Sequence, residues 1–183
     1  MRYDESRRSF LAARDARQAE LERQLRSSTA APSLVTLSLG IPGLDKTPPG
    51  SGALFAWAAR RLAEALPGAK ELLARPDALG PFAIWAATGA PAQVKERCLA
   101  IEAASPAARL VDLDVYAPDG SPVDRASLGL PPRGCLCCGA PARECIRLSR
   151  HPPEEIVSSA HELLTLLSSS FVLANAIPGE PEP

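Results

Sequence analysis

Residues 111–115 alternate apolar side chains with acids, and this pattern constrains the fold more than any other part of the chain. In a β-strand, successive side chains point to opposite faces, so the three apolar residues face one side while Asp112 and Asp114 face the other. The acids are then about 7 Å apart at the backbone, close enough for both carboxylates to bind one Mg²⁺ together with substrate phosphate oxygens. The alternative is an acid pair on the solvated face of an antiparallel sheet.

Arginine dominates the segment that follows the two acids. Between Asp112 and His151 the chain has no lysine, and its basic side chains there are Arg125, Arg133, Arg143, Arg147 and Arg150. The planar guanidinium matches phosphate oxygens in a bidentate manner that a lysine ammonium does not. An acid pair beside an arginine cluster therefore predicts a site for a metal-bound polyphosphate. The alternative is that arginine is the base this chain prefers throughout.

Four of the five cysteines fall within the same block. The spacing of Cys135, Cys138, Cys145 and His151 suits one tetrahedral Cys₃His zinc site. A second Cys-x2-Cys pair is missing, and Cys137 offers a competing thiol, so buried free thiols are the other interpretation. Neither interpretation requires a disulfide.

Composition predicts a small cytoplasmic enzyme. The 183 residues are 46% hydrophobic, which suffices for a single domain over residues 1–183 with a hydrophobic core. A net charge of −1 argues against nucleic acid as a partner. The charged N-terminus does not resemble a signal peptide, and no apolar run approaches the ~20 residues needed to cross a membrane.

Apolar periodicity predicts an α+β domain, with helices packed on a mixed sheet. The expected helices cover residues 4–26, the stripe of Leu54, Ala58, Leu62 and Leu66, a short helix near Leu72, one near Gln93, and residues 156–171. The expected strands cover residues 35–41, 82–87, 98–102 and 111–115. The turn at Pro118-Asp119-Gly120 predicts a hairpin that aims Arg125 back toward the acids. Residues 174–183 are expected to be a flexible tail.

Several short motifs in fixed order resemble one known family. The densest run holds residues 109–115, Gly120, Arg125, residues 130–133, Cys135-Leu136, Cys138, Cys145, Arg147 and Arg150-His151. Upstream matches are residues 14–18, Ile41-Pro42-Gly43, Lys46, Thr88-Gly89, Lys95 and Glu102. In this combination the chain resembles the apo-citrate lyase phosphoribosyl-dephospho-CoA transferases. It departs from the usual family pattern at Ala108 and Gly134, neither of which touches the acid pair.

The resemblance implies a nucleotidyltransferase-like fold and a transfer reaction. The group 2'-(5''-triphosphoribosyl)-3'-dephospho-CoA would pass to a serine of the citrate lyase acyl-carrier protein, with release of pyrophosphate. Asp112 and Asp114 would hold Mg²⁺, and a third catalytic carboxylate would come from Glu102, with Asp124 as the alternative. The phosphate-binding residues implied are Arg125, Arg133 and Arg147, with Lys46 by resemblance only and Arg109 as a contact to the nucleotide or the carrier protein.

Two other functions remain open from the sequence. One is a zinc-stabilised module that binds the carrier protein during assembly without catalysis. The other is a related transferase that modifies the carrier protein of malonate decarboxylase.

Overall fold

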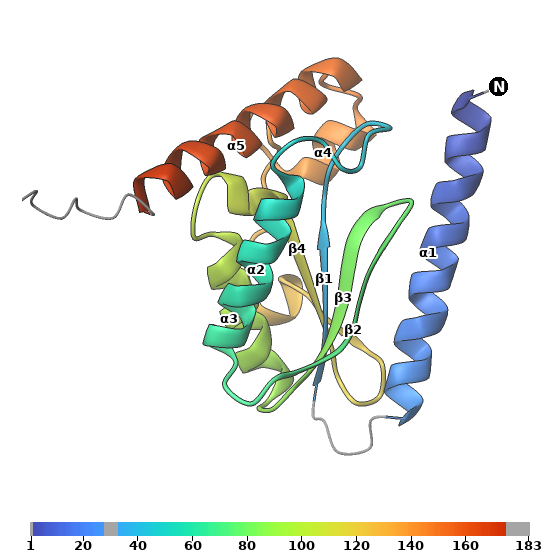
Figure 1. Ribbon diagram of the computed structural model, residues 1–183, viewed down its shortest axis with the longest axis vertical. Coiled ribbons are helices and arrows are strands. Elements are labelled where there is room, and N and C mark those ends of the chain that lie inside the picture. Colours follow the sequence, from blue (N-terminus) through green and yellow to red (C-terminus); the bar gives the residue numbers. More distant parts are fainter. Residues whose placement is uncertain (1, 28–32, 175–183) are drawn as a thin grey trace, which may run out of the picture.

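A five-stranded sheet forms the centre of the computed structural model, which describes residues 2–27 and 33–174 (Figure 1). The strand order is β2-β3-β1-β4-β5. The helices are α1 (Arg2–Ser27), α2 (Ser51–Ala65), α3 (Pro91–Glu102), α4 (Ala142–Arg147) and α5 (Pro153–Ala174), with 3₁₀ turns η1 (Ala107–Leu110) and η2 (Ala126–Leu128). The strands are β1 (Ser33–Leu39), β2 (Lys70–Asp77), β3 (Gly80–Ala87), β4 (Val111–Tyr116) and β5 (Pro122–Val123).

Every strand pair in this sheet is antiparallel, so the expected mixed sheet is wrong while the α+β class is confirmed. Two further elements differ from expectation. The short helix near Leu72 is instead β2, an edge strand whose charged residues hide the strand pattern. Residues 98–102 continue α3, because their buried side chains extend the helical spacing that starts at Val94 and Lys95.

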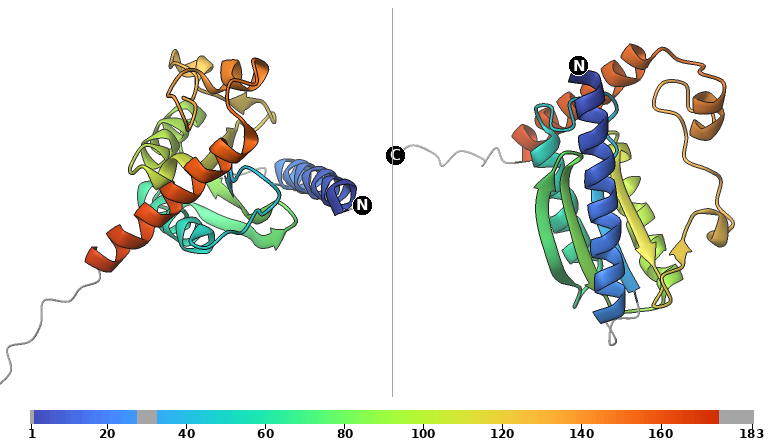
Figure 2. Two further views of the ribbon diagram at one scale, coloured as in Figure 1. Left: turned by 90° about the horizontal axis from the view of Figure 1, so that it is seen from above. Right: turned by 90° about the vertical axis from the view of Figure 1, so that its right-hand side faces the viewer.

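The two faces of the sheet are covered unequally. Helices α2 and α3 cover one face, and α1 lies across the other (Figures 1 and 2). The main core lies under α2 and α3 and includes Val35 and Leu37 of β1 with Val111, Leu113 and Val115 of β4. A smaller cluster on the α1 side contains Leu21, Leu34, Phe82 and Ile84. The α1 face of the sheet is therefore only partly apolar, which leaves room on it for polar side chains.

The hairpin from β4 to β5 is confirmed, although β5 has only two residues. Gly120 has a φ of +82°, which glycine adopts without strain, and its N–H donates to the carbonyl of Ala117 at 2.8 Å. After β5 the chain leaves the sheet in a long excursion before α4 and α5 (Figure 2). Because β5 covers only Val115 and Tyr116, the rest of the outer edge of β4 lacks a strand partner.

The predicted flexible tail, apart from Ala174, lies outside the described residues. Among the described residues, no helix combines the length and the apolar character that a membrane span requires.

Candidate active site

The acid pair lies on the α1 face of β4, as the sequence predicts. Val111, Leu113 and Val115 are fully buried in the main core, and Asp112 and Asp114 point to the opposite side. In the β1–β4 register, Asp112 is opposite Ser38 and Asp114 is opposite Thr36. Residues opposite each other on one sheet face have side chains close enough to interact. Two carboxylates and two hydroxyls thus form one polar patch.

A cavity of about 750 Å³ lies between this patch and α1, and it is called the acid cavity below. Its lining combines polar groups from the sheet with one face of the helix: Arg14, Asp15, Arg17, Gln18, Leu21, Thr36, Ser38, Leu79, Phe82, Asp112, Asp114 and Tyr116. Arg14 is exposed in it, and among the described residues it has no partner for its charge. The acid cavity is large and open enough to admit a phosphate ligand, and its lining contains both arginines and aspartates.

The electrostatics of the acid cavity favour a bound cation. Loss of water around the Asp114 carboxyl, followed by repulsion from Asp112, raises the pKa of Asp114 to about 6. Asp114 is exposed to solvent, and it lines the acid cavity, whose walls place protein atoms on several sides of it. Burial and the same two carboxylates also raise the pKa of Tyr116. A divalent ion between the acids would remove this repulsion.

Two side chains from α3 form hydrogen bonds with the backbone at the unpaired edge of β4. The Leu113 N–H donates to Glu102 Oε1 at 3.0 Å, and the Leu113 carbonyl accepts from Lys95 Nζ at 2.7 Å. Both side chains are buried; Lys95 lies in the second turn of α3, and Glu102 is the last residue of this helix. They supply the hydrogen bonds that a neighbouring strand would otherwise make. These hydrogen bonds fix the position of β4 at the edge that has no strand partner.

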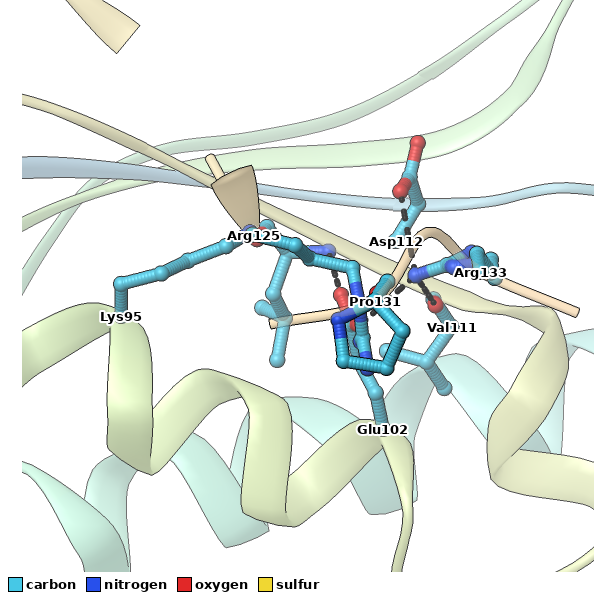
Figure 3. Close-up of polar contacts among 8 residues, drawn as sticks. Lys95, Glu102, Val111, Asp112, Arg125, Pro131 and Arg133 are labelled. Atoms are coloured by element: carbon cyan, nitrogen blue, oxygen red, sulfur yellow. Dashed lines mark hydrogen bonds and ion pairs between the residues drawn. The ribbon is translucent and has the colours of Figure 1, made fainter. Parts of the chain in front are cut away.

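Arg133 connects this edge to the acids (Figure 3). Its Nη2 lies 2.7 Å from Glu102 Oε2 and 3.5 Å from Asp112 Oδ1, and it donates to the Val111 carbonyl at 3.2 Å. Glu102 lies at the end of a helix and not on the strand expected for it, and both of its oxygens are engaged. Asp124, the alternative third carboxylate, accepts from the Ser127 N–H at the start of η2.

The predicted phosphate-binding residues separate into two groups. Arg109, Arg125 and Arg133 line one cavity of about 580 Å³ at the outer edge of β4, called the arginine cavity below. Arg125 therefore lies beside Arg133 and not in the acid cavity. Arg147 is exposed at the end of α4 and lines neither cavity. Lys46 donates to the Ile41 carbonyl at 2.6 Å and lies over the Phe10 ring, away from both.

Arg17 connects helix α1 to the β2–β3 turn. Its guanidinium forms a bidentate pair with Asp77, with both N···O distances 2.7 Å, and donates to the Gly80 carbonyl at 2.9 Å. It also stacks over the Phe82 ring at 4.6 Å from the centroid. Planar pairing of this kind is specific to arginine. It positions α1, and with it Arg14 and Gln18, over the acid cavity.

The predicted zinc ligands converge in the segment between the arginine cavity and α5. One ligand atom from each of Cys135, Cys138, Cys145 and His151 lies within 4.8 Å of the others, and these residues form the Cys/His cluster. His151 Nε2 is 3.3 Å from the Cys138 sulfur, which is 3.5 Å from that of Cys145. Cys137 belongs to a second grouping with His151 and Glu155. The cluster can bind a metal ion.

Backbone groups around the cluster favour the thiolate form of two cysteines. The N–H of Ala140 and the His151 side chain lower the pKa of Cys138 to about 6. The N–H groups of Cys138 and Cys137 lower the pKa of Cys135 against the effect of its burial. Burial, reinforced by the other two sulfurs, raises the pKa of Cys145 to about 11. Thiolates are the metal-ligating form of cysteine.

Comparison with known proteins identifies the family. Residues 5–166 match the family model described as apo-citrate lyase phosphoribosyl-dephospho-CoA transferase. The chain belongs to this family. It is 33% identical to a Streptococcus pyogenes protein named "Probable apo-citrate lyase phosphoribosyl-dephospho-CoA transferase", over 72% of this chain and 71% of that protein. Asp112 and Arg133, which come from separate stretches of the matched region, meet at the edge of β4.

Other relatives match shorter stretches. An Escherichia coli protein named apo-citrate lyase phosphoribosyl-dephospho-CoA transferase is 30% identical over 52% of each chain, so the match spans about half of that relative. "Protein CitXG" of Haemophilus influenzae is 39% identical over 38% of this chain and 15% of its own length.

For some residues of the site, the sequence does not reveal the contacts that they make. Thr36 and Ser38 belong to the polar half of an alternating strand, and only the register with β4 places them opposite the acids. Lys95 and Arg14 are among the residues that resemble the family, but as single bases on helices they do not indicate which groups they contact. Their roles depend on which elements pack together, which a single sequence does not reveal.

Proposed function

We propose that this chain carries out the reaction for which its family is named, the transfer of 2'-(5''-triphosphoribosyl)-3'-dephospho-CoA to apo-citrate lyase. The acceptor is a serine of the acyl-carrier protein, and pyrophosphate leaves. The observation that carries this proposal is the acid pair of β4, aimed into an open cavity and joined to Arg133, in a chain of this family. A nucleotidyltransferase-like fold is part of the proposal, supported by two acids on one strand of an antiparallel sheet.

The bonds that change follow from the proposed donor and acceptor. The serine oxygen forms a bond to the phosphorus nearest the ribose, and the bond from that phosphorus to the bridging oxygen breaks. Pyrophosphate leaves with the electron pair of the broken bond. The serine proton passes to a carboxylate oxygen of the acid pair. Such transfers depend mainly on positioning and charge stabilisation.

The residues of the acid cavity fit Mg²⁺. Asp112 and Asp114 supply carboxylate oxygens, and Thr36 and Ser38 place hydroxyl oxygens opposite them. Oxygen ligands of this kind, completed by phosphate and water, are those that Mg²⁺ prefers. When bound there, the ion would neutralise charge on the reacting phosphate. Arg133, beside Asp112, would bind the oxygens of the neighbouring phosphate.

For the Cys/His cluster we propose Zn²⁺ as the bound ion. Three sulfurs and one imidazole nitrogen are a common ligand set for structural zinc. The N–H groups directed at Cys135 and Cys138 support this choice, because they stabilise thiolates before any ion binds. No open coordination position is needed for the proposed reaction. Metal analysis of the purified protein should find one zinc per chain, and less than half of that after Cys138→Ser.

The transfer is tested by mass spectrometry of apo carrier protein after incubation with the donor, Mg²⁺ and this protein. We expect a mass gain equal to the transferred group, and a rate at least 100-fold lower for Asp112→Asn. Asp119→Asn is the matched control, because Asp119 lies in the exposed turn of the same hairpin and asparagine retains its Oδ1 acceptor.

Either of two results would reject the proposal. One is no mass gain with folded wild-type protein, which would favour a non-catalytic assembly module or the malonate decarboxylase carrier protein as acceptor. The other is an unchanged transfer rate with Asp112→Asn.

A further inference from the structure

The arginine cavity carries an excess of positive charge that its own lining does not neutralise. Its walls are formed by the loop after α3 and by Arg133, Gly134 and Leu136, together with Arg109 and Arg125. Glu102 is the one carboxylate among the lining residues, against three arginines. Both Glu102 oxygens are already engaged, by the Leu113 N–H and by Arg133. A cavity with such a lining favours an anion with more than one negative charge.

Each of the three guanidinium groups is anchored through one nitrogen. Arg109 Nη2 donates to the Cys135 carbonyl at 2.8 Å. Arg125 Nε donates to the Pro131 carbonyl at 2.9 Å, as Figure 3 shows. Arg133 uses Nη2 for its contacts with Glu102 and Asp112. The remaining N–H groups of these arginines have no partner among the described residues. Anchored guanidinium groups lose little entropy when they bind phosphate oxygens, so the site is preorganised.

The arginine cavity and the acid cavity meet at the Arg133–Asp112 contact. Asp112 lines the acid cavity, Arg133 lines the arginine cavity, and 3.5 Å separates their closest atoms. A chain of phosphates that begins at the acid pair would therefore reach the arginines at its far end. In an in-line displacement, the attacking and leaving oxygens lie on opposite sides of the phosphorus. The acceptor serine would then approach from the α1 side.

We infer that the arginine cavity is a pyrophosphate site, which holds the terminal two phosphates of the donor and then the leaving pyrophosphate. This inference rests on the proposed function for the identity of the donor. Inorganic pyrophosphate is the probe, because it carries the same phosphate chemistry without the nucleotide.

The Cys/His cluster adjoins this site through the backbone of Cys135. The carbonyl that anchors Arg109 belongs to Cys135, and Arg133 lies two residues before it. The backbone of Cys135 also pairs with Ala140, which closes the turn that holds the first two sulfurs. A metal ion in the cluster would thus fix the positions of two of the three arginines.

Titration calorimetry of the full chain with sodium pyrophosphate, with and without Mg²⁺, tests the inference. Arg125→Gln removes one charge from the cavity wall and should weaken pyrophosphate binding about ten- to a hundredfold. Arg97→Gln is the control, since this substitution removes the same charge, but from a residue of α3 that donates to the Ala65 carbonyl outside the cavity. Circular dichroism establishes that both variants are folded.

Dephospho-CoA, which carries its own diphosphate, is the second ligand. If Arg125→Gln weakens dephospho-CoA binding and leaves pyrophosphate binding unchanged, the cavity holds the other diphosphate and the inference is overturned. Absence of pyrophosphate binding to the wild type, or equal binding by both variants, overturns it as well. If the wild type catalyses the transfer but Arg125→Gln binds pyrophosphate as tightly as the wild type, this inference alone is rejected. If Arg125→Gln weakens pyrophosphate binding but the wild type catalyses no transfer, the proposed function alone is rejected.

Discussion

At the scale of single residues, Asp114 combines its proposed functional role with a cost in stability. Its carboxyl lies in the wall of the acid cavity beside Asp112, with a pKa of about 6 against an ordinary value of 3.8. A carboxyl whose folded pKa is raised favours the folded state below pH 3.8 and loses that contribution as the pH rises through 6. Without a cation, the ionised Asp114 therefore opposes folding at pH 8.

Asp114→Asn should accordingly stabilise the metal-free protein at pH 8, by about 1 kcal/mol once solvent screening of this partly exposed group is included. At pH 4.5 the difference should be much smaller. Urea denaturation at both pH values in EDTA measures it, with Asp119→Asn as the control. Addition of Mg²⁺ should stabilise the wild type and leave Asp114→Asn unchanged. A variant less stable than the wild type at pH 8 in EDTA would contradict this electrostatic account.

The acid pair can be predicted from the sequence because strand alternation is a local property. The side chains of residues 111–115 alone determine which face of the strand is apolar and which carries the acids. The opposite is true of Arg14 and Ser38. Their relevance arises from the packing of α1 and from the β1–β4 register, both of which depend on contacts between distant segments. Lys46 illustrates the same limit, since a basic residue in a loop turned out to be bonded to the loop itself.

At the scale of elements, α3 acts as a substitute for a strand at the edge of β4. Removing Glu102 would leave the Leu113 N–H unsatisfied and the Arg133 charge without its closest carboxylate. Glu102→Ala should therefore lower the free energy of unfolding by about 2–4 kcal/mol. Glu102→Gln should lose less, because its amide oxygen still accepts from Leu113.

Glu96→Ala is the matched control, since Glu96 is exposed on the same helix and its loss should change stability by less than about 0.5 kcal/mol. Urea denaturation monitored by circular dichroism gives all three values. Equal stability of Glu102→Ala and Glu96→Ala would show that β4 does not depend on α3 at this edge.

A second element-scale prediction concerns the attachment of α1. The helix contacts the sheet through a small apolar cluster near its C-terminal half and through the Arg17–Asp77 pair. Arg17→Ala should release the N-terminal half of α1 while the sheet remains folded. Hydrogen exchange measured by mass spectrometry should then speed up in residues 4–17 and stay unchanged in β1 and β4. Arg23→Ala, at an exposed pair within α1, is the control.

The elements that the sequence misassigned share a physical cause. Residues 98–102 form a short apolar run, which periodicity cannot separate into strand or buried helix. Edge strand β2 exposes Lys70, Glu71 and Arg75, so the alternation typical of strands is absent. In contrast, the stripe of α2 is long and regular, and its buried residues match the predicted ones. Length and regularity of a pattern decided which predictions were correct.

At the scale of the whole molecule, the sheet domain and the segment over residues 124–151 are stabilised by different means. The sheet has an apolar core on each face. In that segment the buried apolar side chains are those of Cys135 and Cys145, while Leu130, Ile146 and Leu148 are exposed. A segment with so small a core generally needs a covalent or metal cross-link to stay ordered. The Cys/His cluster is placed to provide it.

Removal of the proposed zinc ion should therefore unfold this segment and leave the sheet intact. After treatment with a strong zinc chelator, amide exchange in residues 133–151 should become at least tenfold faster, while β1, β3 and β4 keep their protection. Cys138→Ser should reproduce the effect without chelator. Cys137→Ser should not, which also distinguishes the cluster of Cys135, Cys138, Cys145 and His151 from the alternative grouping that contains Cys137. Because Arg109 and Arg133 are positioned by this segment, pyrophosphate binding should fall in parallel with the loss of zinc. Unchanged exchange in residues 133–151 after complete zinc removal would mean that packing against α5 and η1 alone maintains the segment.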